Sequence, residues 1–148
     1  MVSFTITEKG YSLKNGNGEF LKDVAEDFEN EPTKATSYIG KLTSLVYERF
    51  KNGELPLTLV SMDNCSHNGS KLEKAITTFA KHWTENRKVE AEFLTYVKEN
   101  LSYPWSMIDK ITPRPAESVI NILSEIGLED TEVKIGRASC RERVFAGC

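Results

Sequence analysis

The spacing of apolar and polar positions predicts two strands separated by a helix in the first 62 residues. Residues 2–7 alternate apolar and hydroxyl side chains and are rich in β-branched types, which is typical of a strand. Apolar residues recur at helical spacing from Ala35 to Phe50, after Pro32 and before Gly53, and indicate one amphipathic helix. Residues 57–62 form a nearly continuous apolar run, the pattern of a strand covered on both faces. Strand, helix and strand together predict a right-handed crossover unit, so the expected fold class is α/β with a parallel sheet.

Further helices and one turn are predicted along the rest of the chain. Two Asn-Gly pairs within residues 11–21 predict a small surface β-ribbon. The sequence Ser70-Lys71-Leu72-Glu73 has the capping-box pattern and predicts the start of a second helix. A third helix is expected over residues 89–100, and a last one from Pro115 to Gly127. Between them, Tyr103-Pro104-Trp105 predicts an extended turn, because a proline disfavours helical geometry in the residue before it.

Composition narrows the class of protein without identifying it. A chain of 148 residues with 39% apolar and 28% charged residues is ordinary for one soluble domain. Its net charge of −3 gives a nucleic-acid-binding role no electrostatic support, and no apolar run approaches the roughly 20 residues of a membrane span. The start of the chain lacks a secretory signal, and the three cysteines lack C-x-x-C spacing. We therefore expect a cytoplasmic protein with no metal site, no membrane contact and no nucleic-acid partner.

The last residues differ in character from the rest. Residues 135–144 match the translation of a short-read sequencing adapter, so we expect residues 135–148 to be non-native. This tail carries three arginines and one glutamate, so the net charge of the remainder is −5. The predicted strand at residue 2 also has nothing before it to pair with. These two features lead us to expect an internal fragment of a longer protein.

Polar side chains follow both predicted strands, at the sheet edge where ligands of parallel α/β folds bind. The second strand is followed by Asp63-Asn64-Cys65-Ser66-His67-Asn68-Gly69. An asparagine amide in this position can donate to a substrate oxygen on which negative charge develops. The alternative is a turn and helix entry built from Asx hydrogen bonds. Glu8 follows the first strand, where a cofactor would lie, and its alternative is a charged turn.

The remaining candidates have simple structural alternatives. His67 could act as a base or metal ligand and Cys65 as a nucleophile, but no partner residue is evident for either. His82 is expected on the solvent side of its helix. The pair Asp109-Lys110 fits either a surface ion pair or a partly buried, oriented acid, and the pattern favours neither.

Three segments together resemble the mannitol dehydrogenase family. Thr5-x-Thr7-Glu8-Lys9-Gly10-Tyr11 resembles its T-x-T-E-K-G-Y segment, and Ser61-Met62-Asp63-Asn64 with Asn68-Gly69 resembles its S-C-D-N-x-x-x-N-G segment. The run from Tyr103-Pro104 through Ser106-Met107-Ile108-Asp109-Lys110-Ile111-Thr112-Pro113 is similar to its F-P-x-[ST]-M-V-D-R-I-T-P signature. Order and approximate spacing agree from residue 1 to about residue 133.

The resemblance implies a metal-free oxidoreductase that transfers a hydride between a secondary alcohol and a ketone, with NAD or NADP as cofactor. It implies a sugar alcohol or hexonate substrate of the mannitol/fructose or mannonate/fructuronate type, and a parent enzyme that is a monomer or small oligomer. Residues 1–113 would be the later part of a Rossmann-type domain, and residues 114–134 the start of a mostly helical substrate domain. By position in the motifs, Asn64 would polarise the substrate oxygen. Substrate contacts would come from Asp109, Asn68 and Lys110, and cofactor contacts from Thr7, Glu8 and Asp63.

Departures and absences qualify this implication. Met62 and Trp105 stand where the family commonly has Cys and Asn, and Lys110 stands where it has Arg, which puts any bidentate role of that arginine in doubt. The sequence contains no G-x-G-x-x-G and no segment resembling the family's catalytic lysine after Pro113. We therefore expect the isolated chain to be inactive. The alternative function is a non-catalytic α/β ligand-binding or interaction module.

Overall fold

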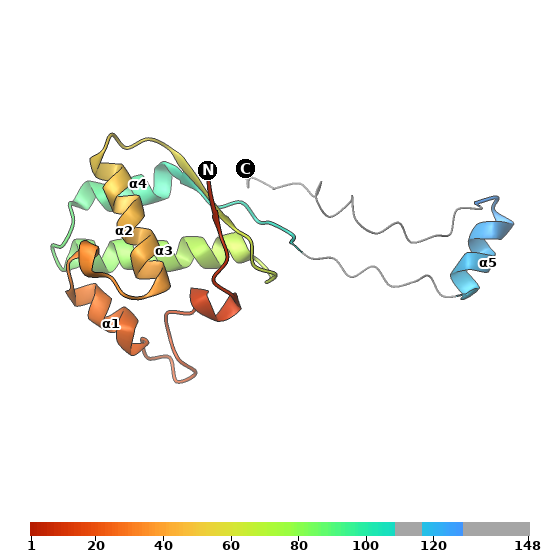
Figure 1. The fold of residues 1–148 in the computed structure, drawn as a ribbon, viewed down its shortest axis with the longest axis horizontal. Coiled ribbons are helices and arrows are strands. Elements are labelled where there is room, and N and C mark those ends of the chain that lie inside the picture. The colour runs from red at the N-terminus through yellow and green to blue at the C-terminus, as the bar shows by residue number, and fades with distance from the viewer. Residues whose placement is uncertain (109–116, 129–148) are drawn as a thin grey trace.

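The computed structural model describes residues 1–108 and 117–128 as alternating strands and helices (Figure 1). In chain order these are β1 (Val2–Phe4), the 3-10 helix η1 (Glu8–Tyr11), α1 (Lys22–Glu29), the 3-10 helix η2 (Pro32–Lys34), α2 (Tyr38–Lys51), β2 (Leu57–Ser61), α3 (Asn68–Glu85), α4 (Ala91–Glu99), β3 (Leu101–Ser102) and α5 (Glu117–Glu125).

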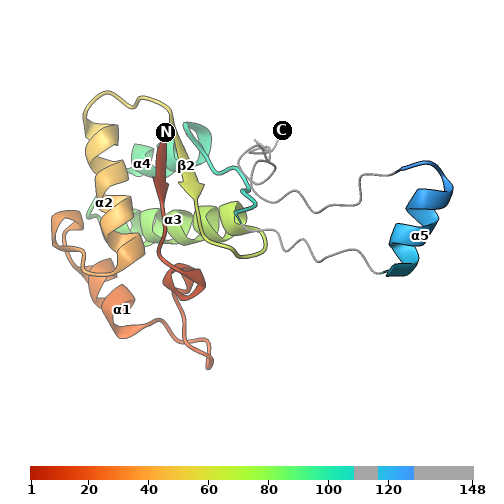
Figure 2. The same cartoon turned by 45° about the vertical axis from the view of Figure 1, so that its right-hand side comes forward.

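The sheet is parallel, with β2 between β1 and β3. Val2 of β1 lies opposite Leu59, and Leu57 lies opposite Leu101 of β3. The segment from η1 to α2, which includes α1, connects β1 to β2, and α3 with α4 connects β2 to β3 (Figure 2). The predicted α/β class and parallel sheet are confirmed. All three strands therefore direct their carboxyl ends toward the same edge.

Helix α3 is the centre of the hydrophobic core. Its apolar face is fully buried and packs against α1, α2, α4 and β2; the face consists of Leu72, Ala75, Ile76, Phe79, Ala80 and Trp83. The rings of Phe79 and Trp83 meet edge to face at a centroid distance of 5.5 Å. Burial of each large apolar side chain contributes about 1.5–3 kcal/mol, so this face anchors the helix that starts beside the sheet's carboxyl edge.

Two segments before β2 differ from the sequence prediction. Helix α1 was not predicted, because its eight residues bury only Val24, Asp27 and Phe28, too few for an apolar stripe. Helix α2 begins at Tyr38, not near Pro32, because the Ser37 hydroxyl caps it and accepts the Gly40 amide at 3.1 Å.

The predicted ribbon is smaller than expected, and the capping box is wrong. In the described residues the ribbon consists of a single antiparallel bridge, between Lys14 and Phe20. Helix α3 begins at Asn68, so Ser70 lies inside its first turn and does not cap it. The residue before the helix is His67, in the left-handed conformation with φ of 54°. The short strand β3 was not predicted, since two residues carry no periodicity.

The second half of the chain also requires one correction. His82 is half-buried and stacks on Phe28 with a centroid distance of 4.0 Å, so its predicted place on the solvent side is wrong. The last helix is present as α5, and none of its residues is buried. The expected domain boundary at residue 113 and the expected non-native tail lie outside the described residues and remain predictions.

Candidate functional site at the carboxyl edge of the sheet

The buried carboxylate of Asp63 joins the ends of the two longer strands. One of its oxygens accepts the backbone amide of Ile6 at 2.9 Å, and the other accepts that of Thr7 at 2.9 Å. The Tyr11 hydroxyl donates to the same carboxylate at 2.5 Å. Residues that are 52 to 57 positions apart in the sequence are therefore in direct contact. The structure thus brings together the Thr5–Tyr11 segment and the Ser61–Gly69 segment, two of the three that resemble the family.

These hydrogen bonds also set the protonation state of Asp63. Burial by itself raises the pKa of the Asp63 carboxyl, but the hydrogen bonds from Ile6, Tyr11 and Thr7 outweigh it and hold the pKa below the ordinary value of 3.8. Burial, together with the bond to Asp63, raises the pKa of the Tyr11 phenol. At neutral pH the pair is therefore a carboxylate and a neutral phenol that donates to it.

Low pH is expected to lower the unfolding free energy of the chain, partly because Asp63 becomes protonated. Because its pKa is lower in the folded state, its contribution is complete above the ordinary aspartate pKa and is lost as the pH falls through the folded-state value. Urea unfolding should show that the difference in unfolding free energy between the wild type and Asp63→Asn is constant above about pH 5 and shrinks below about pH 4. Asp23→Asn, on the exposed side of α1, is the control. A difference independent of pH would contradict this role for the carboxylate.

Thr7 has a backbone conformation that β-branched residues rarely adopt. Its φ is 63° and its ψ is 162°, a conformation that costs on the order of 1–3 kcal/mol. The hydrogen bond from its amide to Asp63 stabilises this turn between β1 and η1. As a result, the side chains of Thr7 and Glu8 are exposed at the sheet edge. Of the three predicted cofactor residues, Thr7 and Glu8 are therefore accessible at this edge, whereas Asp63 is buried behind them.

Asn68 connects the same edge to the segment after β3. It is 1% exposed, and its side-chain nitrogen lies 3.2 Å from the Asp63 carbonyl oxygen and 2.8 Å from the Ser106 carbonyl oxygen. The Asn68 side-chain oxygen accepts the Ser106 amide at 3.1 Å. The Ser106 hydroxyl in turn donates to the Ser61 carbonyl at the end of β2. The third motif, which begins at Tyr103, therefore starts beside the other two motifs.

The side chains between Asp63 and Asn68 are more accessible. Asn64 and His67 are exposed, and the His67 and Trp105 rings pack edge to face at a centroid distance of 4.4 Å. Cys65 is half-buried, and burial raises the pKa of its thiol, which disfavours the thiolate that a nucleophile requires. Of this loop, Asn64 best fits a role as hydrogen-bond donor to a ligand.

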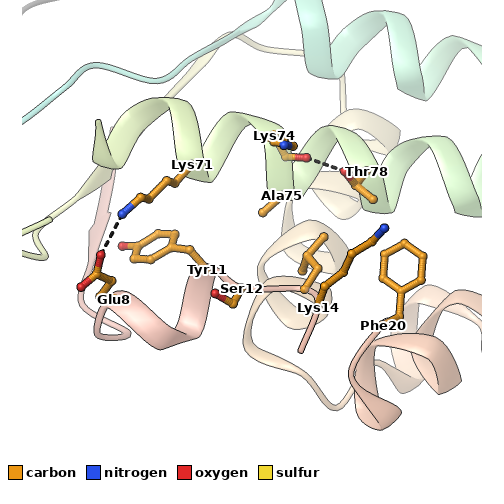
Figure 3. A pocket seen from close by; sticks show the side chains of 10 residues that line it. Glu8, Tyr11, Ser12, Lys14, Phe20, Lys71, Lys74, Ala75 and Thr78 are labelled. Atoms are coloured by element: carbon orange, nitrogen blue, oxygen red, sulfur yellow. Dashed lines mark hydrogen bonds and ion pairs between the residues drawn. The ribbon is translucent and has the colours of Figure 1, made fainter. Parts of the chain in front are cut away.

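A pocket of about 500 Å³ adjoins this edge between η1, the Lys14–Phe20 turn and α3 (Figure 3). It is lined by Glu8, Tyr11, Ser12, Leu13, Lys14, Phe20, Lys71, Lys74, Ala75 and Thr78. Lys71 pairs with Glu8 at 2.9 Å, and this hydrogen bond raises the pKa of Lys71. The ion pairs of the described residues include neither Lys14 nor Lys74. The lining therefore has an excess of positive charge, which suits an anionic ligand.

Two of the predicted substrate-binding residues, Asp109 and Lys110, lie outside the described residues. Within residues 1–108 and 117–128, no group of three or more His, Cys, Asp or Glu side chains is arranged to hold a metal ion. None of the helices in the same part of the chain is both long enough and apolar enough to cross a membrane.

The fold and the edge geometry define a Rossmann-type domain, and comparison with known proteins supports this class. A family model described as the mannitol dehydrogenase Rossmann domain matches residues 2–139. The chain therefore belongs to the mannitol dehydrogenase family, as its three motifs indicated.

Relatives and a solved structure agree with this assignment. The chain is 41% identical to the D-mannonate oxidoreductase of Thermotoga maritima over 133 residues, which is 90% of this chain and 25% of that protein. It is 32% identical to the mannitol 2-dehydrogenase of Pyrenophora tritici-repentis, over 88% of this chain and 23% of that protein. The crystal structure of a D-sorbitol dehydrogenase in substrate-free form matches with a TM-score of 0.59 at 32% identity, over 86% of this chain and 26% of that one. The chain spans about a quarter of the length of these relatives.

Sequence reasoning missed three participants at this edge. Tyr11 and Ser61 share a 2.6 Å hydrogen bond behind Asp63, and Ser106 receives the Asn68 side chain. All three residues lie in the recognised motifs, but nothing in the motifs says which neighbour each of them contacts. Ser61 did carry a signal, since a hydroxyl at the end of a buried strand requires a polar partner.

Proposed function

We propose that this chain forms one wall of the active-site cleft of an NAD(P)-dependent oxidoreductase that interconverts a sugar alcohol or hexonate and its keto form. The observation that carries the proposal is the meeting of the Thr7–Glu8 turn and the Asn64 loop at the carboxyl ends of adjacent parallel strands. This is where open parallel sheets bind nucleotides and substrates.

The roles proposed for Asn64, Thr7, Glu8 and Asp63 use groups at this edge. The exposed amide of Asn64 donates to the substrate oxygen, where negative charge develops as the carbonyl forms or is attacked. Thr7 and Glu8 would contact the cofactor, and Asp63 would support that contact by holding the Thr7 amide. The chemistry supplied by a bound nicotinamide would be acceptance or donation of the hydride. Asp109 and Lys110 remain the proposed substrate-contacting residues, whereas the Asn68 side chain is almost completely buried and supports the edge through its contacts with Asp63 and Ser106.

The exposed groups present at the edge fit a dinucleotide and an acidic substrate. Both ligands are anionic, and the adjoining pocket has three lysines against one glutamate. Among possible substrates we favour a hexonate of the mannonate/fructuronate type. Identity to the D-mannonate oxidoreductase is 41%, compared with 32% to the mannitol 2-dehydrogenase from Pyrenophora tritici-repentis.

A chimera tests the proposed reaction, because the chain matches only a quarter of its relatives. The aligned 133-residue segment of the Thermotoga maritima enzyme is replaced by the matching part of this chain. The folded chimera is expected to reduce NAD⁺ in the presence of D-mannonate, followed as absorbance of NADH. The recipient enzyme is the positive control, and the isolated 148-residue chain is the inactive control. A folded chimera that transfers no hydride would contradict the proposal and favour a non-catalytic module.

A further inference from the structure

We propose that Asn68 and Gly69 are positioning residues that form a seat for residues 103–108 at the start of α3. By the same contacts they set where that segment lies relative to the Asn64 loop. The catalytic consequence rests on the proposed function, whereas the docking itself is a property of this chain. A positioning role differs from direct substrate contact because the Asn68 side chain is almost completely buried.

The Asn68 side chain uses both of its atoms to hold neighbouring segments. Its nitrogen lies 2.8 Å from both the carbonyl and the hydroxyl oxygen of Ser106, and 3.2 Å from the Asp63 carbonyl oxygen. Its oxygen accepts the amides of Gly69, at 2.8 Å, and Ser106, at 3.1 Å. One side chain therefore binds both the beginning of the Asn64 loop and the segment after β3.

The donor nitrogen makes asparagine specific for this position. Two of the three groups facing the nitrogen are carbonyl oxygens, which can only accept hydrogen bonds. The hydroxyl of Ser106 donates its proton to the Ser61 carbonyl, so its lone pairs are free to accept from Asn68. An aspartate of the same shape at residue 68 would place a carboxylate oxygen against these acceptors. The seat therefore requires the donor nitrogen of an amide, and a side chain of the same shape without that donor would not suffice.

Gly69 is required because another segment approaches its Cα closely, and not because its backbone conformation is unusual. A Cβ atom at this position would lie 2.8 Å from the Pro104 carbonyl oxygen and 2.8 Å from Cδ1 of Trp105. Real Cβ contacts essentially never fall below 3.0 Å. Glycine is thus needed because the 103–108 segment passes directly over the first turn of α3.

Further contacts hold the same segment in place. The indole nitrogen of Trp105 donates to the Ser70 hydroxyl at 2.9 Å, and the Trp105 ring meets His67. Residues 103–108 lead along the chain to Asp109 and Lys110. The seat therefore positions the start of the family's signature segment beside Asn64. This accounts for an Asn-Gly pair at a place where the sequence predicted a substrate contact.

The two tryptophans allow a direct test on the 148-residue chain. The indole N–H of Trp105 reports the seat, whereas that of Trp83 donates to the Asp27 carbonyl at 2.7 Å and reports the core. Hydrogen exchange of both is measured by ¹⁵N NMR, with Trp105→Phe to assign the signals. In Asn68→Asp we expect Trp105 exchange to accelerate by about two- to tenfold, as for loss of an ordinary net hydrogen bond, with Trp83 unchanged.

A matched control and a second variant keep the outcome decisive. Asn17→Asp makes the same charge change at an exposed turn and should leave both signals unchanged. If Asn68→Asp unfolds the core and exposes Trp83, Ser106→Ala is the deciding variant. It removes only the half-buried hydroxyl that bridges Asn68 and Ser61. Accelerated exchange at Trp105 alone in Ser106→Ala supports the seat. Unchanged Trp105 exchange in every variant whose core remains protected would overturn it.

The hydrogen-exchange experiment does not measure turnover. A negative result would therefore contradict the seat without bearing on the proposed function. An unchanged Trp105 signal would leave the hydride-transfer assay of the chimera standing. Conversely, an inactive chimera would leave the docking of residues 103–108 intact.

Discussion

Replacing Asn64 by alanine in the active chimera is expected to lower kcat by about 10²–10³-fold. An amide that donates to developing negative charge stabilises the transition state more than the bound substrate, and loss of one such donor has about this effect. Asn64 is exposed in the loop between β2 and α3, so its truncation should leave the fold intact. Steady-state kinetics with D-mannonate would give kcat and KM separately, and circular dichroism would verify folding.

Two comparison variants make the result specific to Asn64. Asn17→Ala removes an exposed asparagine from the turn near Phe20 and should retain full activity. Asn64→Asp keeps the size but replaces the donor by a negative acceptor, so it should be at least as impaired as the alanine variant. A change confined to KM would indicate uniform binding and would exclude the proposed role in the chemical step.

Replacing Asp27 by alanine is expected to lower the unfolding free energy of the chain by about 3–4 kcal/mol. The carboxylate is fully buried and accepts four hydrogen bonds. These come from the amides and hydroxyls of Thr36 and Ser37, the latter being the residue that caps α2. Truncation would leave these donors without an acceptor and would open a cavity between α1 and α2. Urea denaturation followed by circular dichroism measures the loss.

Glu26→Ala, one position earlier on the exposed face of α1, is the control. Its one ion pair, with Lys22 at 3.9 Å, is exposed, so the change should stay within about 0.5 kcal/mol. In the chimera, Asp27→Ala should lower thermal stability but leave kcat of the surviving folded enzyme unchanged, because Asp27 does not contact the carboxyl edge. An equally small effect of both variants would show that the buried carboxylate does not anchor α2.

The dominant periodicities of the sequence were sufficient to predict the fold class. The stripes of α2 and α3 and the apolar run of β2 follow local rules of helix and strand geometry, so they predicted the crossover unit correctly. The same local rules failed where the pattern is short. Helix α1 buries a charged Asp27 beside two apolar residues, and its place depends on partners in the η2–α2 connection and on α3. Thr36 is nine residues from Asp27 but lies beyond the helix, and Trp83 of α3 is 56 residues away, so neither partner contributes to the periodicity of α1.

The motifs determined which residues meet at the carboxyl edge, but the role of each side chain there was decided by the tertiary structure. Thr7, Glu8, Asp63, Asn64 and Asn68 were all selected from the sequence as groups at strand ends. Only the folded chain divides them into exposed groups, such as Asn64, and buried ones, such as Asp63 and Asn68. The physical reason is that the deciding partners, the Ile6–Tyr11 segment for Asp63 and Ser106 for Asn68, are 38 to 57 residues away. A carboxylate or amide in the sequence is simply polar, and contacts at that separation decide whether it faces a ligand or holds the cleft together.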